Sequence, residues 1–162
     1  MKPASLLAVL GALVCLPLPS SAQSAEAISA RQGNTPAVIA HRGGALLGTE
    51  NSISCLANGI ELGSDMVEID VHMTADGELI VCHDPTIDRT TDGKGNIKDY
   101  THEELQQFHL ENGETIPDLK DVFELIEKHD ALANLEFKTD KYEYRGIEEI
   151  VLNMVREYEF RH

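Results

Sequence analysis

Apolar and polar residues alternate strictly over residues 66–73, and this alternation is the clearest structural pattern in the chain. The apolar positions are Val67, Ile69 and Val71, and the polar positions are Glu68, Asp70 and His72. A period of two predicts a β-strand whose successive side chains point to opposite faces. The polar face is either a solvated sheet surface or a rigid platform for two neighbouring carboxylates.

Strands and helices alternate along the rest of the chain. A short apolar run at residues 36–40 fits a buried strand, and Asn51 is the expected N-cap of the helix that follows. Residues 134–138 predict a third strand, and apolar stripes predict helices over residues 119–126 and 147–158. Strand–helix–strand units are parallel crossovers, so the three strands should end at the same edge of one α/β sheet.

A hairpin is expected directly after the alternating strand. Asp76 and Gly77 separate that strand from a second extended run at residues 79–84, and Asp-Gly between two such runs is a strong hairpin signal. If these two residues form the turn, counting back places Asp70 opposite His83. Directly opposed residues share a face with their Cβ atoms about 5 Å apart. The hairpin should therefore bring His83 to the carboxylates.

The amino-terminal residues have the pattern of a secretory signal. Residues 1–22 contain one lysine, an apolar run and a small-residue cleavage site that ends at Ala22. The apolar run is too short and too interrupted by proline to span a bilayer. We expect residues 23–35 to be a leader and residues 36–162 to form one domain, secreted or periplasmic, with no transmembrane segment in the mature chain.

The charge and cysteine content narrow the classes of partner. The formal net charge is −15, and it becomes about −16 when Lys2 is removed with the signal. Nucleic acid is not expected as a partner, because its phosphates are bound through an excess of Lys and Arg. Hard divalent cations suit an acidic chain better. Cys55 and Cys82 would remain in the mature chain, and nothing in the sequence decides whether they pair.

The charged residues at the strand ends form a candidate catalytic site, and its members are His41, Arg42, Glu68, Asp70, His83, Glu136 and Lys138. The three carboxylates, Glu68, Asp70 and Glu136, point to one divalent cation, Mg²⁺ or Ca²⁺, since unpaired carboxylates repel one another and need a counter-charge. His41 and His83 offer a general base and a general acid for transfer at phosphorus. Arg42 and Lys138 supply positive charge for a phosphate group.

A series of short motifs carries a resemblance to a known family. In order, these motifs are His41-Arg42-Gly43, Glu50-Asn51, Glu68-x-Asp70, Thr74-x-Asp76-Gly77, His83-Asp84, Arg89-x-Thr91-x-Gly93, Ile116-Pro117 and Glu136-x-Lys138. Their order and spacing resemble those of the glycerophosphodiester phosphodiesterase family. The resemblance covers about residues 37–138, so residues 36–162 are interpreted as the N-terminal part of such a domain.

The resemblance implies a fold and a reaction. The fold is a TIM-type barrel of the phospholipase C-like phosphodiesterase kind, with a β-hairpin in the loop after its second strand. Its site holds one divalent metal on Glu68, Asp70 and Glu136. His41 and His83 share the acid and base roles, while Arg42 and Lys138 hold the phosphate. The substrate is a small glycerophosphodiester or lysophospholipid, and the products of the glycerophosphodiester are glycerol 3-phosphate and an alcohol.

The chain departs from the family pattern in length and at one loop position. Thr49 stands where the family usually has proline. An eight-unit barrel needs roughly 200 residues or more, whereas this chain contains about three strand-helix units. A truncated chain of this kind therefore has a second interpretation, as a non-catalytic or partner-requiring remnant that binds a divalent cation and needs the missing barrel half. A sphingomyelinase-type phospholipase D, which is similar in barrel and site, is a third.

Overall fold

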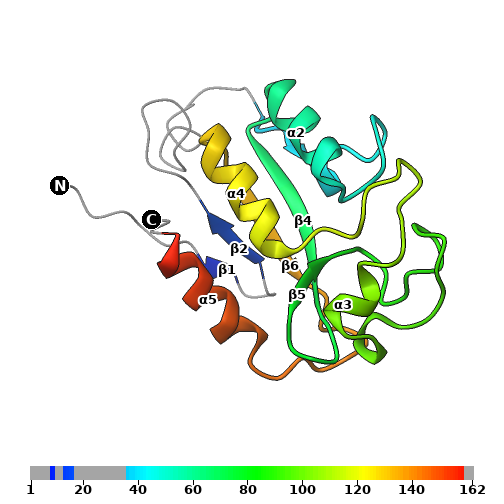
Figure 1. Cartoon of the computed structure of the whole chain (residues 1–162). Coiled ribbons are helices and arrows are strands. Elements are labelled where there is room, and N and C mark those ends of the chain that lie inside the picture. Colours follow the sequence, from blue (N-terminus) through cyan, green and yellow to red (C-terminus); the bar gives the residue numbers. More distant parts are fainter. Residues whose placement is uncertain (1–7, 10–12, 17–35, 159–162) are drawn as a thin grey trace.

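The computed structural model describes residues 8–9, 13–16 and 36–158 (Figure 1). The strands are β1 (Ala8–Val9), β2 (Leu13–Leu16), β3 (Ile39–Ala40), β4 (Met66–Met73), β5 (Leu79–Val81) and β6 (Ala133–Phe137). The α-helices are α2 (Ile53–Glu61), α3 (His102–Leu105), α4 (Leu119–His129) and α5 (Ile147–Glu157). Two 3₁₀ turns, η1 (His41–Gly43) and η2 (Ile97–Asp99), complete the described elements.

One sheet organises these elements, with strand order β1-β2-β6-β4-β3 and with β5 paired to β4. β4 lies parallel to both β3 and β6, which confirms the expected parallel units and the α/β class. In the β4–β6 pair, Asp70 lies opposite Glu136. The predicted third strand therefore brings its carboxylate directly beside the alternating strand.

Both faces of β4 are buried, which rules out the solvated interpretation of its polar side. The apolar face of β4 packs in the main core with side chains of α2, α4 and α5, and α4 runs alongside the strand in Figure 1. Fully burying a large aliphatic side chain contributes about 1.5–3 kcal/mol. The packing on one face thus fixes the direction of the carboxylates on the other.

The hairpin between β4 and β5 exists, but its predicted register is wrong by one residue. Val71 pairs with Val81 and Met73 with Leu79, so Cys82 and not His83 lies opposite Asp70. The loop contains three residues: the amide of Gly77 donates to the carbonyl of Thr74, and Gly77 has φ +89°. A type I turn followed by a left-handed residue forms a bulge and shifts the pairing by one position.

Residues 85–117 form an excursion over the end of β5, and this excursion has a hydrophobic cluster of its own. The cluster contains Ile80, Cys82, Ile87, Ile97, Leu105, Leu110 and Ile116. The side chain of Thr101 and that of Glu104 form a reciprocal capping box at the start of α3. The excursion is therefore a packed unit that holds its charged residues in place over the sheet.

The helix that follows η1 begins one residue later than predicted. Ser52 is the N-cap of α2, and its hydroxyl accepts a hydrogen bond from the Cys55 amide. Asn51 has a left-handed backbone, with φ +59°, and its side chain points elsewhere. Both Cys55 and Cys82 are free, buried thiols, so the open question of their pairing is answered by the structure.

Two short strands fall within the predicted signal peptide. β2 pairs antiparallel with β6 through residues 13–16, and β1 pairs with β2. The predicted cleavage position at Ala22 and the leader at 23–35 lie outside the described residues. Among the described residues, no helix combines the length and the apolar character needed to cross a bilayer.

The turn that carries His41 and Arg42 depends on two glycines that allow close packing. A Cβ on Gly59 of α2 would lie 2.5 Å from the carbonyl oxygen of Gly43, a backbone atom that cannot move away cheaply. We therefore expect Gly59→Ala to lower the free energy of unfolding by about 1–3 kcal/mol, the usual cost of overpacking. Asn58→Ala, at an exposed position of the same helix, is the matched control in denaturant unfolding. Equal stabilities of the two variants would contradict this packing.

Candidate active site

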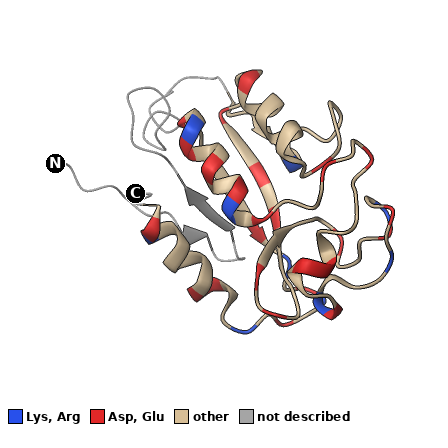
Figure 2. Ribbon diagram, viewed as in Figure 1, with Lys and Arg blue, Asp and Glu red and all other residues tan. Residues whose placement is uncertain are grey.

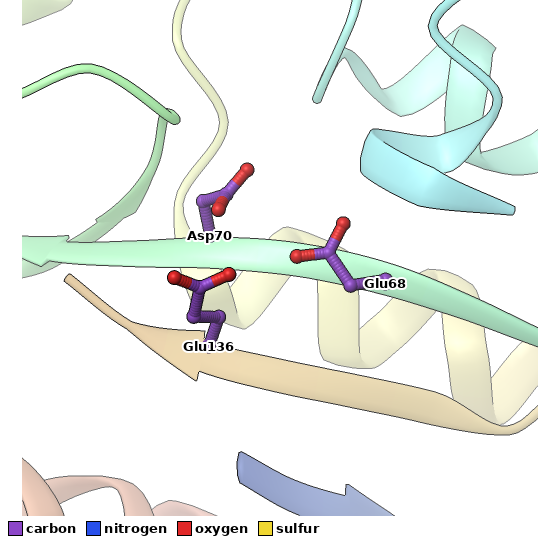
Figure 3. A group of neighbouring side chains, drawn as sticks. All are labelled: Glu68, Asp70 and Glu136. Atoms are coloured by element: carbon purple, nitrogen blue, oxygen red, sulfur yellow. The ribbon is translucent and has the colours of Figure 1, made fainter. Parts of the chain in front are cut away.

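Three carboxylates from two neighbouring parallel strands meet above the sheet (Figure 3). Glu68 and Asp70 project from β4, and Glu136 projects from β6. One oxygen from each side chain lies within 4.8 Å of the others. The structure therefore brings together all three of the acidic residues expected as metal ligands.

The carboxylates are arranged as a cation site requires. Asp70 is fully buried and Glu68 is nearly so, whereas Glu136 is partly exposed. Asp70 Oδ1 and Glu68 Oε1 are buried, and neither accepts a hydrogen bond among the described residues. A buried anionic oxygen without a donor is costly, and a hard divalent cation satisfies such oxygens. The residues present thus fit an oxygen-liganded cation.

Two cations border the carboxylates, although the chain as a whole is acidic and Lys and Arg are the sparser charges in Figure 2. Lys138 Nζ donates to Glu136 Oε1 at 2.9 Å and lies 3.5 Å from Asp70 Oδ1. Burial opposes the charge of Lys138, but its contacts with Glu136 and Asp70 outweigh burial and raise its pKa. Arg42 Nε lies 3.8 Å from Asp70 Oδ2. Both predicted phosphate-binding residues therefore adjoin the cluster.

The η1 turn places His41 and Arg42 at the cluster through an uncommon backbone conformation. Arg42 has φ +53° and ψ +37°, a left-handed geometry that non-glycine residues rarely adopt. In this conformation its amide donates to Glu68 Oε2 at 2.7 Å. His41 Nε2 lies 3.9 Å from the same oxygen, and its side chain is largely exposed. The backbone strain at Arg42 thus accompanies a direct contact to the acidic cluster.

His83 is attached to the site differently from the prediction. It follows β5, and its Nδ1 lies 2.7 Å from Asp84 Oδ1. Asp84 also accepts a hydrogen bond from Arg89 Nε, and this bond, more than the one from His83, lowers the pKa of Asp84 to about 2. An ionised Asp84 is an acceptor only, so the hydrogen in this contact belongs to His83 Nδ1.

Asn51 is a site residue that the sequence interpretation assigned to helix capping. Its Nδ2 donates to Asp70 Oδ2 at 2.9 Å, and its buried Oδ1 accepts no hydrogen bond among the described residues. Neither α-helical spacing nor strand alternation could indicate this contact, which spans 19 residues. The Glu50-Asn51 motif of the family resemblance marked this position, but it did not indicate that Asn51 contacts Asp70.

His72 lies on the polar face of β4, where its buried ring connects neighbouring segments of the chain. Its Nδ1 lies 2.9 Å from the Tyr144 hydroxyl and its Nε2 lies 3.3 Å from the carbonyl of His83. Burial lowers the pKa of His72 to about 4, so this ring is neutral near neutral pH. It connects β4 with the segments after β5 and β6, and its ring nitrogens contact Tyr144 and His83.

The raised pKa of Glu68 makes stability without a cation depend on pH. Burial, with the charge of Asp70 next, raises this pKa above its ordinary value of 4.5. The folded protein then keeps the Glu68 proton to higher pH than the unfolded chain does, so stability falls as pH rises from that value through the raised pKa. Glu68→Gln removes this loss, and in chelator near neutral pH we expect its melting temperature to exceed that of the unsubstituted chain.

Saturating Mg²⁺ or Ca²⁺ should reverse the order of the two melting temperatures, since the unsubstituted chain offers the cation three carboxylates and Glu68→Gln offers two. Calorimetric melts across the acidic and neutral range, with chelator and with cation, measure both effects. An unsubstituted chain that stays more stable than Glu68→Gln in chelator near neutral pH would contradict this account of Glu68.

The fold and the site define a class of protein. Three carboxylates and two cationic side chains gather on one face of two neighbouring parallel strands of an α/β sheet. TIM-like barrels build their active sites on strands of this kind, and three carboxylates beside cationic side chains suit metal-assisted chemistry at phosphorus. The model of the glycerophosphoryl diester phosphodiesterase family matches residues 41–159, and this chain belongs to that family.

Individual relatives support the same assignment. The chain is 45% identical over 130 residues to a glycerophosphodiester phosphodiesterase of Caldanaerobacter subterraneus subsp. tengcongensis, covering 76% of this chain and 54% of the relative. It is 38% identical over 130 residues to the Bacillus altitudinis enzyme, covering 75% of this chain and 53% of the relative. The chain thus spans about half the length of these curated relatives.

Solved structures show the same fold. An Oleispira antarctica phosphodiesterase in complex with the product sn-glycerol-3-phosphate superposes with a TM-score of 0.71 and 32% identity, covering 76% of this chain and 53% of that one. A glycerophosphodiester phosphodiesterase of Agrobacterium tumefaciens superposes with a TM-score of 0.69 and 27% identity, covering 78% and 54%. The parallel sheet and these neighbours agree with a TIM-like fold.

Proposed function

We propose that this chain carries the catalytic half of a metal-dependent hydrolase that cleaves glycerophosphodiesters to glycerol 3-phosphate and an alcohol. The observation that supports this most is the carboxylate cluster: two of its buried oxygens accept no hydrogen bond among the described residues, and two cations flank it. The Oleispira antarctica neighbour, with its bound sn-glycerol-3-phosphate, supports the same substrate class.

The roles follow from the contacts. Glu68, Asp70 and Glu136 would hold one divalent cation, Mg²⁺ or Ca²⁺. When bound there, such an ion would withdraw charge from phosphoryl oxygens and so favour attack at phosphorus. Arg42 and Lys138 lie beside these carboxylates, where they can bind and orient the phosphate oxygens of the diester.

The two histidines are proposed to manage the protons of hydrolysis. In the overall reaction, water adds to phosphorus, the ester bond to the alcohol breaks, and the departing oxygen takes up a proton. His83 holds its hydrogen at Nδ1 against Asp84, which leaves Nε2 available for exchange with a reacting oxygen. His41, largely exposed and close to Glu68, is available for the second proton transfer.

An exposed apolar groove indicates that a further protein segment packs against this part of the chain. It is lined along β3 and the end of α2, and the large hydrophobic residues exposed on this side are Val38, Ile39, Leu46, Leu47 and Leu62. Contiguous exposed apolar surface of this kind normally contacts another protein segment. We propose that the remaining units of a TIM-type barrel cover it, and that without them residues 36–162 are a partner-requiring remnant.

We further propose that residues 1–22 direct secretion and are removed. Cleavage after Ala22 would remove both β1 and β2 and free the backbone edge of β6 that β2 now pairs. A parallel barrel strand could then pair with that edge. This is consistent with a secreted or periplasmic domain, and mass spectrometry of the exported protein tests the cleavage position.

Product identification tests the proposed reaction against its alternatives. In the presence of Mg²⁺ or Ca²⁺, we expect glycerol 3-phosphate and choline from glycerophosphocholine, with lysophosphatidylcholine as a second substrate to compare. Release of choline from sphingomyelin without glycerol 3-phosphate from glycerophosphocholine would favour the sphingomyelinase-type phospholipase D. Cation binding with no hydrolysis of any of these would favour the non-catalytic remnant.

A further inference from the structure

Arg89 joins two parts of the site that lie far apart in the sequence. Its Nη1 and Nη2 donate to the two carboxylate oxygens of Glu50 at 2.8 and 2.7 Å, and its Nε donates to Asp84 Oδ2 at 2.6 Å. Beyond these partners, Glu50 accepts from Arg42 Nη1 at 3.2 Å and Asp84 accepts from His83. Arg89 thus lies midway along a continuous chain of contacts between a phosphate-binding cation and a proposed acid-base histidine.

We propose that Arg89 is a positioning residue: through the carboxylates on its two sides it fixes the imidazole of His83 and the guanidinium of Arg42. This inference rests on the proposed function and adds to it a residue that touches neither substrate nor cation. Only arginine suits the position, because its planar fork binds one carboxylate with two parallel bonds and a second through Nε.

The arrangement has a defined consequence for His83. The guanidinium keeps Asp84 ionised and turned so that one oxygen faces His83 Nδ1. A neutral His83 therefore carries its hydrogen on Nδ1 and presents a bare Nε2, the form that a general base requires. Without Arg89, Asp84 is free to rotate, and the ring loses the contact that selects this form.

The arrangement has a second consequence at Arg42. Glu50 is held from one side by Arg89, and the hydrogen bond from Arg89 contributes most to lowering the pKa of Glu50. The fixed carboxylate then supports Arg42 Nη1, while Arg42 Nε lies near Asp70. Loss of Arg89 removes two hydrogen bonds that hold Glu50, so the angle at which Arg42 faces a phosphate is no longer set.

The backbone of the loop that carries Arg89 is held in place by buried side chains and by hydrogen bonds within the loop. Ile87 and Ile97 of this loop are fully buried in the second hydrophobic cluster. The amide of Thr91 and its hydroxyl both donate to the carbonyl of Ile87, which forms a tight turn around Arg89. Although the Arg89 side chain is partly exposed, its backbone is anchored on the core.

The test uses Arg89→Gln, with Arg145→Gln as the matched control, since Arg145 is exposed and pairs with Glu143, which is exposed as well. Proton–nitrogen correlation spectra of the histidine rings are recorded at mildly alkaline pH. We expect the hydrogen of neutral His83 on Nδ1 in the unsubstituted chain and in Arg145→Gln, and a mixture of both tautomers in Arg89→Gln. An unchanged His83 spectrum in Arg89→Gln would overturn the proposal.

Kinetics provide the second readout, and loss of an orienting partner typically costs about 10–100-fold in activity. Arg89→Gln should lower kcat, through His83, and raise KM for the diester, through Arg42. Asp84→Asn should lower kcat with little change in KM, and it also serves for the spectra if Arg89→Gln does not fold. A uniform loss of folded protein with unchanged kcat and KM would overturn the positioning role.

These outcomes are distinguishable from a failure of the proposed function. The histidine spectra require no turnover, so they judge the positioning of His83 even in a chain that hydrolyses nothing. Conversely, a chain that hydrolyses the diester but keeps its His83 tautomer in Arg89→Gln retains the proposed function and loses this inference.

Discussion

Replacement of His83 by alanine should lower the rate of glycerol 3-phosphate release by about 10²–10⁴-fold, the usual contribution of a positioned acid or base. Cation binding should remain, because His83 pairs with Asp84 and is not one of the three carboxylates that would hold the cation. The measurement is hydrolysis of glycerophosphocholine at saturating cation, together with a calorimetric cation titration of the same variant.

His109→Ala is the matched control for this prediction. His109 is exposed, and its ring is paired with Asp92 on the surface of the excursion. Its loss should leave both hydrolysis and cation binding unchanged. A His83→Ala variant as active as His109→Ala would remove His83 from the reaction, and the proton transfer would have to be reassigned.

Replacement of Asp70 by asparagine should have the largest effect on the cation. Asp70 is the central carboxylate, fully buried and surrounded by Asn51, Arg42 and Lys138. Its side chain keeps its size as asparagine but loses its charge, so affinity for Mg²⁺ and Ca²⁺ should fall by more than about 100-fold, beyond the cost of losing an outer partner. Calorimetric titration with each ion measures this.

Asp121→Asn, at an exposed position of α4, carries the same change of charge away from the site. It should bind each ion as the unsubstituted chain does. If Asp70→Asn kept the affinity of this control, the cation would have to bind elsewhere on the acidic surface, and the repulsion within the cluster would be balanced by the chain's own side chains, including Arg42, Lys138 and Asn51.

The sequence predicted the sheet and its carboxylates well, for a physical reason. Alternation over β4 and β6 is imposed by packing on one face, so it locates Glu68, Asp70 and Glu136 on the other. Parallel crossovers then set Asp70 beside Glu136 without knowledge of any distant contact. The solvated interpretation of β4 failed because burial of its polar face depends on η1 and on the excursion, neither of which is encoded within the strand.

The hairpin register could not be fixed from the sequence. Asp-Gly suits a two-residue turn and also the last two positions of the three-residue turn that the chain adopts. The difference in free energy between these two turns depends on neighbouring residues such as Thr74. The hydroxyl of Thr74 accepts a hydrogen bond from the amide of Glu78. A shift of one residue then displaced His83 from the position opposite Asp70.

The contacts that support the site also could not be predicted from the local sequence pattern. Asn51 reaches Asp70 across 19 residues, and Arg89 reaches Glu50 across 39. No helical or strand periodicity relates positions so far apart. The motifs that contain these residues marked them as notable without showing what they touch, and only the folded arrangement of η1, β4 and the excursion assigns their partners.

The most direct test of the central claim is one hydrolysis measurement made before and after chelation. Release of glycerol 3-phosphate from glycerophosphocholine should stop when chelator removes the divalent ion and return when Mg²⁺ or Ca²⁺ is added in excess. Hydrolysis that continues unchanged in chelator would contradict a carboxylate-bound cation as the centre of this active site, and hydrolysis that is absent under both conditions would contradict the proposed reaction and leave the non-catalytic remnant.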